Sequence, residues 1–486
     1  MMIIFKEFLI VILVVLFSIA TFSQSSVILY TYAQDIVPKY IIQGNSISGF
    51  CHDIIVELNK ELKKDNVEIR YKSSTAKPIQ QIISSLSNKE TQIFVGVPHS
   101  EEWEKNVKYI RLPLYGVREI YIIKSDMENV LNVKESMKVG VIGGTVTARK
   151  IPNMPQEQEI FEYKSIAEAI EALDKGKVDT LFLSSLPLGY YISQSKGKYK
   201  SMNAPSEKSY QYIVFSKSVE DKVVRVVEEA LKRILTNSVI DKLIKKHGLE
   251  GYVLPGNVVE IVFTDFKPYE WYDESNKAYL GMDVEVVRKV FEKLGFRVVF
   301  YTFPWTRCLE LMKTKMYDGA ISAIETEERK SFLTYSKEPL STGYEVLFKL
   351  KSSKIDISST ERIPKDTVCG YTDGYAYGDW FWNAGFKKVP VATDEDGFEL
   401  LKNGRIALFV ANFFVGKRIA QEMKLEVESS PNFSGRRFMY ATFSKNVHGE
   451  YLADIFSSKL REFKGTVEYL DILRRYGTTY EEMWGK

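Results

Sequence analysis

Two kinds of residue block alternate along the second half of the chain. Residues 258–263 (VVEIVF) are mostly apolar and bounded by turn residues, which predicts a buried strand. Residues 282–294 carry apolar residues at helical spacing and stop before a glycine, which predicts a helix. We expect a further strand over 296–301, a helix over 306–315 and a strand over 319–324. This β-α-β-α-β order predicts a mainly parallel sheet covered by helices.

A second unit of the same kind follows, from about residue 367 to 410. The chain then returns in a strand over 438–443 and ends in helices. The first half has the same order of segments: VILYTY, DIIVELNKEL, VEIRY, PIQQIISSL, TQIFVGV, KVGVIGG, SIAEAIEAL, DTLFL and YIVFS. Both halves are therefore expected to be α/β.

Short motifs recur between the halves at a nearly constant separation. Pro113-Leu114 corresponds to Pro339-Leu340, and the tripeptide Phe-Ser-Lys that begins at Phe215 recurs from Phe443. Several further pairs, such as Gly176 and Gly404, keep almost the same spacing. They predict a tandem pair of domains whose boundary lies near 251–257 (GYVLPGN), where proline and glycine interrupt the chain.

Each predicted domain has one lobe built from its two ends and another from its middle. The chain then crosses twice between the lobes, which makes a hinge and places a ligand cleft between them. The predicted segments are a signal peptide over 1–23; a first domain over 26–250, with lobes 26–122 plus 216–250 and 123–215; and a second domain over 257–486, with lobes 257–349 plus 441–486 and 350–440.

The N-terminal residues have the pattern of a secretory signal. Lys6 precedes an apolar run over 8–20, and small residues follow, so cleavage is expected after Ala20 or Ser23. The prediction is export to the periplasm or beyond the cell. An uncleaved membrane anchor is the alternative. Because no cysteine follows the run, a lipoprotein anchor is not expected.

The composition argues against several classes of function. Lys and Arg total 66 against 63 Asp and Glu, a net charge of +3, which argues against a nucleic-acid surface. Apolar residues make up 45%, enough to exclude long disorder. The four histidines and three cysteines form no CxxC or HExxH motif, so neither a metal site nor a cofactor is expected.

Four motifs of the second half give a specific resemblance. They are DFKPYEW (265–271), LGMDVEVV (280–287), DGAISAIETEERKSFLTYSKEPL (318–340) and GRIALFVAN (404–412). Each half resembles a bacterial extracellular solute-binding protein of the polar-amino-acid type, family 3, over residues 26–249 and 257–486. The resemblance implies two tandem type II periplasmic-binding-protein domains with mainly parallel sheets.

The resemblance implies that Arg329 holds a carboxylate of the ligand. A guanidinium can grip a carboxylate through two parallel hydrogen bonds. Ser322 and the backbone of Ile324 match positions that add hydrogen bonds to the same ligand. The alternative for Arg329 is a solvated side chain in the charged run 325–330.

Aromatic residues match the family's lid over the ligand. Phe266 and Tyr269 would cover its apolar body or stack on its charge, unless they only pack the loop. Trp305 is expected either in the core or in the lower cleft.

The other lobe departs from the family's pattern. Gly374 and Tyr375 match a Gly-Thr turn that binds the carboxylate, with tyrosine in place of threonine. Asn412 stands where many members carry an aspartate that pairs with the ligand's ammonium. Because asparagine is neutral, a standard α-amino acid is in doubt, and a carboxylate with a weaker or displaced cation becomes an alternative.

The first half departs further. Trp103 replaces the arginine, Ser184 takes the position of Asn412, and Thr145 keeps the usual threonine. Either this domain presents an aromatic face to an apolar or cationic ligand, or it is a scaffold; the sequence leaves both open.

The leading hypothesis is a non-enzymatic, monomeric binding protein that closes over a small polar solute, an amino acid or related carboxylate, and delivers it to an ABC-transporter permease. Two alternatives remain. One is a lyase of the cyclohexadienyl-dehydratase type, for which Asp265, Glu270 and Glu325 are candidate acids or bases. The other is a ligand-sensing module.

Overall fold

The computed structural model describes residues 26–34, 36–127, 136–143, 145, 148, 151, 157–204 and 206–485. The predicted signal segment lies outside these residues and stays a prediction. The chain divides into two compact units, one made of residues up to 95, 101–108 and 214–234, the other of 96–100, 109–213 and 235–486. No helix in the described ranges is long and apolar enough to cross a membrane.

The first unit is built on a parallel strand pair. β1 (Val27–Thr31) pairs with β4 (Val67–Tyr71), and α2 (Phe50–Leu62) connects them in sequence. α2 buries Phe50, Ile54 and Leu58, which recur every four residues and so share one face. Its other elements are β2 (Ile41–Gln43), β3 (Ser46–Ser48), η1 (Lys63–Asp65), α3 (Ile79–Ser87) and α4 (Glu101–Glu104). Residues of both units contribute to β5 (Ile93–Pro98), β6 (Val107–Tyr109), β13 (Ser209–Ser216) and α8 (Asp221–Thr236).

The second unit begins with a five-stranded sheet of order β10-β9-β11-β8-β12. Its strands are β8 (Glu119–Lys124), β9 (Ser136–Ile142), β10 (Glu157–Tyr163), β11 (Thr180–Ser184) and β12 (Tyr199–Asn203). β9 is parallel to β10 and β11, whereas β8 is antiparallel to β11 and β12. The associated helices are η2 (Ser125–Met127), α6 (Ile166–Asp174) and α7 (Ser185–Gln194). Leu173 of α6 packs in a buried cluster with Leu181 of β11.

Three antiparallel strands join the two halves of the chain. β7 (Tyr115–Val117) pairs with β13 on one side and with β14 (Val253–Pro255) on the other. α9 (Val239–Lys246) precedes β14. β14 includes part of the predicted linker, so this linker forms part of a sheet.

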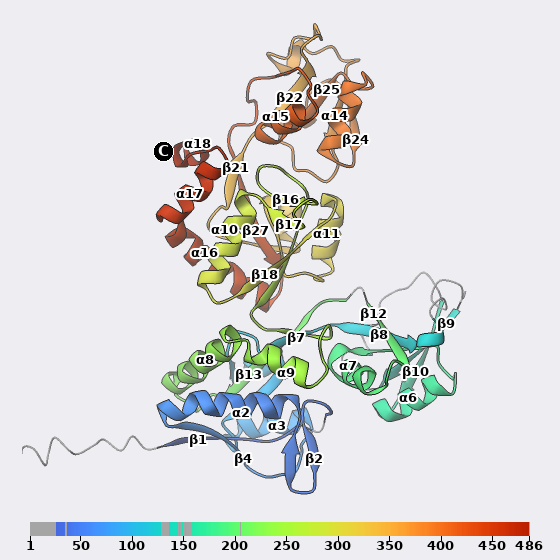
Figure 1. Cartoon of the computed structure of the whole chain (residues 1–486), viewed down its shortest axis with the longest axis vertical. Helices are drawn as coiled ribbons and strands as arrows, with labels where there is room; N and C mark the ends of the chain where they lie inside the picture. Colours follow the sequence, from blue (N-terminus) through green and yellow to red (C-terminus); the bar gives the residue numbers. More distant parts are fainter. Residues whose placement is uncertain are drawn as a thin grey trace, which may run out of the picture. The chain divides into compact units, whose positions relative to one another are not determined.

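The second half starts with a sheet of order β18-β15-β19-β27-β20, with β21 also paired to β27. Its strands are β15 (Val258–Phe263), β18 (Arg297–Thr302), β19 (Gly319–Ile324), β20 (Leu333–Tyr335), β21 (Ser341–Gly343) and β27 (Arg437–Ser444). β15 is parallel to β18 and β19, while β27 runs antiparallel to its partners. The other elements are β16 (Trp271–Asp273), β17 (Ala278–Leu280), α10 (Met282–Lys293), α11 (Trp305–Lys313), α12 (Glu327–Lys330), α16 (Val447–Lys464), α17 (Val467–Arg475) and α18 (Tyr480–Trp484). α10 and α16 lie side by side (Figure 1).

The second lobe of this half is a sheet of order β24-β23-β25-β22-β26. Its strands are β22 (Glu345–Leu350), β23 (Val368–Thr372), β24 (Lys387–Val391), β25 (Leu408–Asn412) and β26 (Val427–Ser429), and its helices are η4 (Thr360–Arg362), α13 (Asp379–Trp382), α14 (Asp394–Lys402) and α15 (Phe413–Glu422). The strand order repeats that of the sheet in the first half, with β25 in the place of β11 and β22 in the place of β8. The strand directions are the same as well.

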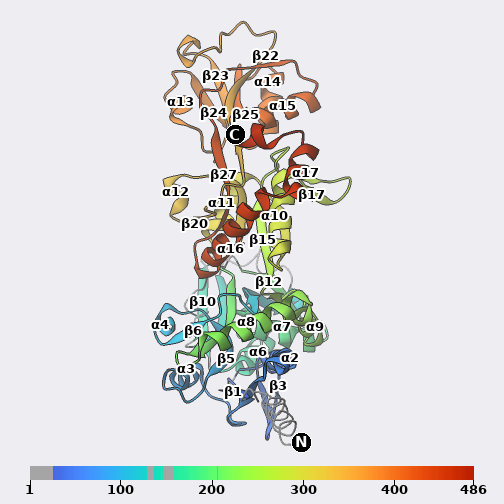
Figure 2. The ribbon, with the colours of Figure 1, turned by 90° about the vertical axis from the view of Figure 1, so that its left-hand side faces the viewer.

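The chain passes between these two lobes twice. It leaves the first lobe through β21 and enters β22, and it returns from β26 through β27 (Figure 2). β21 and β27 are paired at the crossing, with Gly343 opposite Arg437. The two crossings therefore lie against each other and hold both lobes next to one pocket.

The predicted α/β class with mainly parallel sheets is confirmed. The predicted strands over 258–263 and 319–324 coincide with β15 and β19. The helix predicted over 306–315 begins one residue earlier and ends two residues earlier, a difference typical of helix ends. The limits of the predicted domains stay a prediction.

Candidate functional site

The pocket lies where the two lobes of the second half meet, next to the paired crossings β21 and β27. Residues from both lobes and from the crossings contribute to its wall. They are Thr264, Phe266, Glu270, Trp305, Ile321, Ser322, Ile324, Arg329, Gly343, Glu345, Tyr375, Ala376, Tyr377, Asn412, Arg437 and Met439. Seven of the nine predicted second-half residues are in this set; Tyr269 and Gly374 are not.

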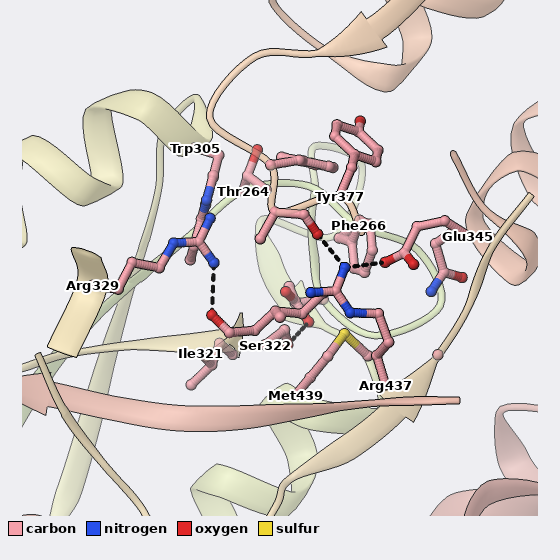
Figure 3. Close-up of a pocket in the computed structure, with 16 residues that line it drawn as sticks. Thr264, Phe266, Trp305, Ile321, Ser322, Arg329, Glu345, Tyr377, Arg437 and Met439 are labelled. Atoms are coloured by element: carbon pink, nitrogen blue, oxygen red, sulfur yellow. Dashed lines mark hydrogen bonds and ion pairs between the residues drawn. The ribbon is translucent and has the colours of Figure 1, made fainter. Parts of the chain in front are cut away.

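Arg329 lies in the short helix α12, which Thr326 caps by accepting a hydrogen bond from the Arg329 backbone N–H at 3.2 Å. The side chain is 5% exposed and points into the pocket (Figure 3). Its guanidinium donates to the carbonyl oxygens of Ile324 at 2.8 Å and Gly374 at 2.7 Å, one from each lobe. It also lies 5.4 Å from the Trp305 ring, within cation–π range.

The guanidinium of Arg329 has no anionic partner in the described part of the chain. Among the described residues, no carboxylate oxygen lies within 4.0 Å of a guanidinium nitrogen of Arg329. The acceptors of this guanidinium are neutral carbonyls. Burial lowers its pKa, because the charged form loses hydration. A buried charge without a counter-charge costs free energy. An anion in the pocket would offset that cost.

A tight turn after β23 presents the carbonyl of Gly374 to Arg329. Gly374 has φ +75°, and a Cβ there would lie 2.9 Å from Cγ2 of Thr306, so the turn favours glycine. The next residue, Tyr375, lines the pocket and meets the Phe266 ring edge-on at 5.9 Å. The predicted Gly-Tyr turn thus contributes a carbonyl and a ring to this region.

The two predicted lid residues occupy different places. Phe266 lines the pocket, and its ring stacks on that of Tyr269 at 5.3 Å. Tyr269 is 1% exposed, and its hydroxyl donates to the carbonyl of Thr342 at 2.8 Å. Tyr269 therefore packs against Phe266 from the core side, and its buried hydroxyl bonds to the backbone.

Ser322 bridges two buried carboxyl groups. A bulge in β19 gives it φ +57°, a left-handed conformation that is uncommon outside glycine. Its hydroxyl lies 2.6 Å from Oε2 of Glu270 and 2.8 Å from Oδ2 of Asp283. Ser341 also donates to Asp283, at 2.5 Å. One hydroxyl has one proton, so a second proton is needed between the two carboxyls.

That second proton belongs on a carboxyl group. Burial and the charge of Asp283 raise the pKa of Glu270 well above its usual value, and burial raises the pKa of Asp283 to about 7. The two carboxyls therefore keep a proton between them to a higher pH than free carboxyls would. Of the three candidate acids, Glu270 is the one that lines the pocket; Glu325 pairs with Lys330 at 2.6 Å, and Asp265 accepts from Tyr272 N–H at 3.0 Å.

Asn412 ends β25 and caps α15. Its Oδ1 accepts from the backbone N–H groups of Phe414 at 3.0 Å and Val415 at 3.4 Å. The side-chain oxygen is thus committed to the helix end, and Asn412 offers no charge to the pocket.

Two charged residues of the pocket, Glu345 and Arg437, escaped the sequence analysis. Glu345 is 7% exposed and pairs in register with Asn412. Arg437 donates to the carbonyl of Ala376, and its Nη1 lies 3.5 Å from Oε1 of Glu345. Oε2 of Glu345 is buried without a hydrogen-bond partner. A sequence signal existed: Glu345 is the one charged residue in the run GYEVLF and begins β22.

The three first-half candidates are divided between the two compact units. Trp103 lies in α4 of the first unit, whereas Thr145 and Ser184 belong to the second. The Thr145 hydroxyl donates to the carbonyl of Ile142 at 2.8 Å and accepts from the Ala148 N–H at 3.2 Å. Ser184 ends β11. In the described ranges, no group of three or more His, Cys, Asp or Glu side chains could hold a metal ion.

Residues 259–479 match the model of a family described as bacterial extracellular solute-binding proteins, family 3. The ABC transporter glutamine-binding protein GlnH of Bacillus subtilis (strain 168) is 24% identical over 206 residues, which cover 42% of this chain and 73% of that protein. The arginine-binding periplasmic protein of Mannheimia haemolytica is 23% identical over 238 residues, 47% of this chain and 95% of that protein.

A solved structure that aligns with both halves is the periplasmic domain of B. pertussis BvgS, determined at 3.1 Å. It has 15% sequence identity and a TM-score of 0.39, with 93% of this chain and 91% of that chain covered.

Proposed function

We propose that the second half, whose residues 259–479 match the model of the bacterial extracellular solute-binding proteins, family 3, binds a small polar solute bearing a carboxylate and closes its two lobes over it. An amino acid or a related carboxylate fits this description. Export to the periplasm and delivery to an ABC-transporter permease are part of the same proposal.

The observation that carries the proposal is the buried, unneutralised guanidinium of Arg329. Its neutral acceptors, the carbonyls of Ile324 and Gly374, are weaker partners than a carboxylate. A carboxylate would replace them with two charge-assisted hydrogen bonds in a site already removed from water. The gain in electrostatic free energy favours binding.

The position of Arg329 also links binding to closure. It belongs to the first lobe, and Gly374 to the second, so one side chain bridges both lobes. Ligand contacts that exist in full only when both lobes meet shift the population toward the closed form. The aromatic rings of Phe266 and Tyr375 then exclude water from the bound solute.

The test is calorimetric titration of the protein with a panel of amino acids and organic acids, after a thermal-shift screen to find ligands. Arg329→Ala should weaken binding by about 2–5 kcal/mol, because the ligand's carboxylate loses its buried partner. Arg329→Lys should recover only part of this, since an ammonium lacks the planar fork.

Arg307→Ala is the matched control. Arg307 is on the neighbouring helix α11, has a 55% exposed side chain and pairs with Glu310. The Arg307→Ala variant should bind ligand with the same affinity as the unaltered protein. Equal affinities of the Arg329→Ala and Arg307→Ala variants for every ligand found would refute the role of Arg329.

A further inference from the structure

A second guanidinium, that of Arg437, enters the same pocket as Arg329. Arg437 is the first residue of β27, opposite Gly343 of β21, so it stands on the crossing between the lobes. Its side chain is 21% exposed and lines the pocket. Arg329 and Arg437 extend into the pocket from different sides (Figure 3).

The two cations act on each other. Burial is the main cause of the lowered pKa of Arg329, and the charge of Arg437 lowers it further. Tyr335 and Glu328 act in the opposite direction. Repulsion between like charges adds to the cost of burying each of them. One anion between them, or two anionic groups of one molecule, would relieve this repulsion.

The pocket contains little negative charge to balance them. Glu270 and Asp283 share a proton through Ser322, so the two carboxyls together carry one negative charge instead of two. Glu345 is the remaining carboxyl of the lining set, and its contact with Arg437, at 3.5 Å, is long for a charge-assisted hydrogen bond. Among the described lining residues, only the Glu345 carboxylate thus lies within ion-pair distance of either guanidinium.

The partners of Arg437 leave it available. It donates to the carbonyl of Ala376, a neutral acceptor in the second lobe, and its ionic contact with Glu345 is loose. A guanidinium has five N–H donors, so it can keep Glu345 as a positioning partner while it binds a further carboxylate. Glu345 then keeps the arginine turned toward the pocket.

From these contacts we propose that the pocket selects a solute with two anionic groups, a small dicarboxylate or an acidic amino acid. One carboxylate is held by Arg329 and the other by Arg437. The inference rests on the proposed function and specifies, in addition, that the ligand carries two anionic groups. It also separates this pocket from a site for a cationic solute, which would place a third positive group beside these two.

The experiment measures charge selectivity by calorimetry on the protein from residue 26 onward. The panel pairs molecules of similar size: glutamate with glutamine, aspartate with asparagine, glutarate with its monoamide, and arginine as the cationic member. We expect each diacid to bind at least about tenfold more tightly than its amide partner, a difference of about 1.4 kcal/mol. Arginine should be the weakest ligand.

Arg437→Gln should bring the ratio of diacid to amide affinity to about one, and Arg437→Lys should recover part of it. The ratio is measured within one variant, so a general loss of folded protein does not alter it. Arg436→Gln, at the exposed neighbouring residue, is the control and should keep the selectivity of the unaltered protein.

The outcomes separate this inference from the proposed function. If amides or arginine bind as tightly as diacids, or if Arg437→Gln keeps the diacid preference, the inference is wrong. The proposed function still stands in that case, provided that binding depends on Arg329. If no member of the panel binds, both fail.

Discussion

Lys208 lies at the centre of a buried group of charges where the two halves of the chain join. Its side chain is 2% exposed, and its ammonium lies 2.7 Å from Oδ2 of Asp318 and 2.5 Å from Oε2 of Glu260. Arg118 also pairs with Glu260, and the Tyr210 hydroxyl bonds to Asp318. Lys208, Arg118 and Tyr210 precede the linker, whereas both acids follow it.

Lys208→Met tests how much this group stabilises the second half. The substitution keeps most of the side-chain volume and removes the charge. Asp318 then loses its ion pair with Lys208, and Glu260 keeps only its ion pair with Arg118. Breaking a buried ion pair by removing one partner costs about 3–5 kcal/mol, because the remaining charge is uncompensated. We expect a loss of stability in that range.

Urea unfolding followed by tryptophan fluorescence measures the change. Five of the six tryptophans lie after residue 257, so the signal reports mainly on the second half. Lys337→Met is the control: its ammonium lies 2.9 Å from Asp454, but the two side chains are 75% and 58% exposed. Such a surface pair contributes about 0–1 kcal/mol. A Lys208→Met effect as small as that of the control would refute the reasoning.

Two further predictions concern pH. Burial lowers the pKa of His448 to about 4, so the unfolded chain binds a proton that the folded chain does not, and stability falls by up to about 1.4 kcal/mol per unit as pH drops from 6.5 toward 4. His448→Phe should flatten this slope in urea unfolding; an unchanged slope would exclude the histidine as its source. The raised pKa of Glu270 acts in the opposite direction and costs stability as pH rises above its unfolded value. Glu270→Gln should therefore gain stability relative to the unaltered protein between pH 5 and 8, and a relative loss would contradict the assignment.

The sequence predicted the strands that are buried on both faces. Residues 258–263 and 319–324 are nearly continuous apolar runs between turn residues, and each coincides with a strand of the structure. Helix ends were predicted less well: the helix expected from residue 306 begins at Trp305, directly after Pro304 at its N-cap.

The resemblance grouped candidate site residues where they share one motif. Ser322, Ile324 and Arg329 lie within eight positions on one strand exit, so a resemblance could place them together. The roles of the two aromatic residues were harder to predict, because both lie on one loop. Phe266 lines the pocket, whereas the hydroxyl of Tyr269 donates to the carbonyl of Thr342 inside the core. Their difference depends on a tertiary contact between segments far apart in the sequence.

The position of Glu345 in the pocket could not be predicted from the sequence. The neutral Asn412 had suggested that the second lobe lacks a negative charge, yet its register partner on β22 is a carboxylate. Only strand pairing places the two side by side. This carboxylate already contacts Arg437, so an ammonium group of the ligand would compete with that guanidinium for it. The pocket therefore gives the ligand two guanidinium groups. The carboxylate of Glu345, whose Oε2 has no hydrogen-bond partner, would be shared between Arg437 and any ammonium group of the ligand.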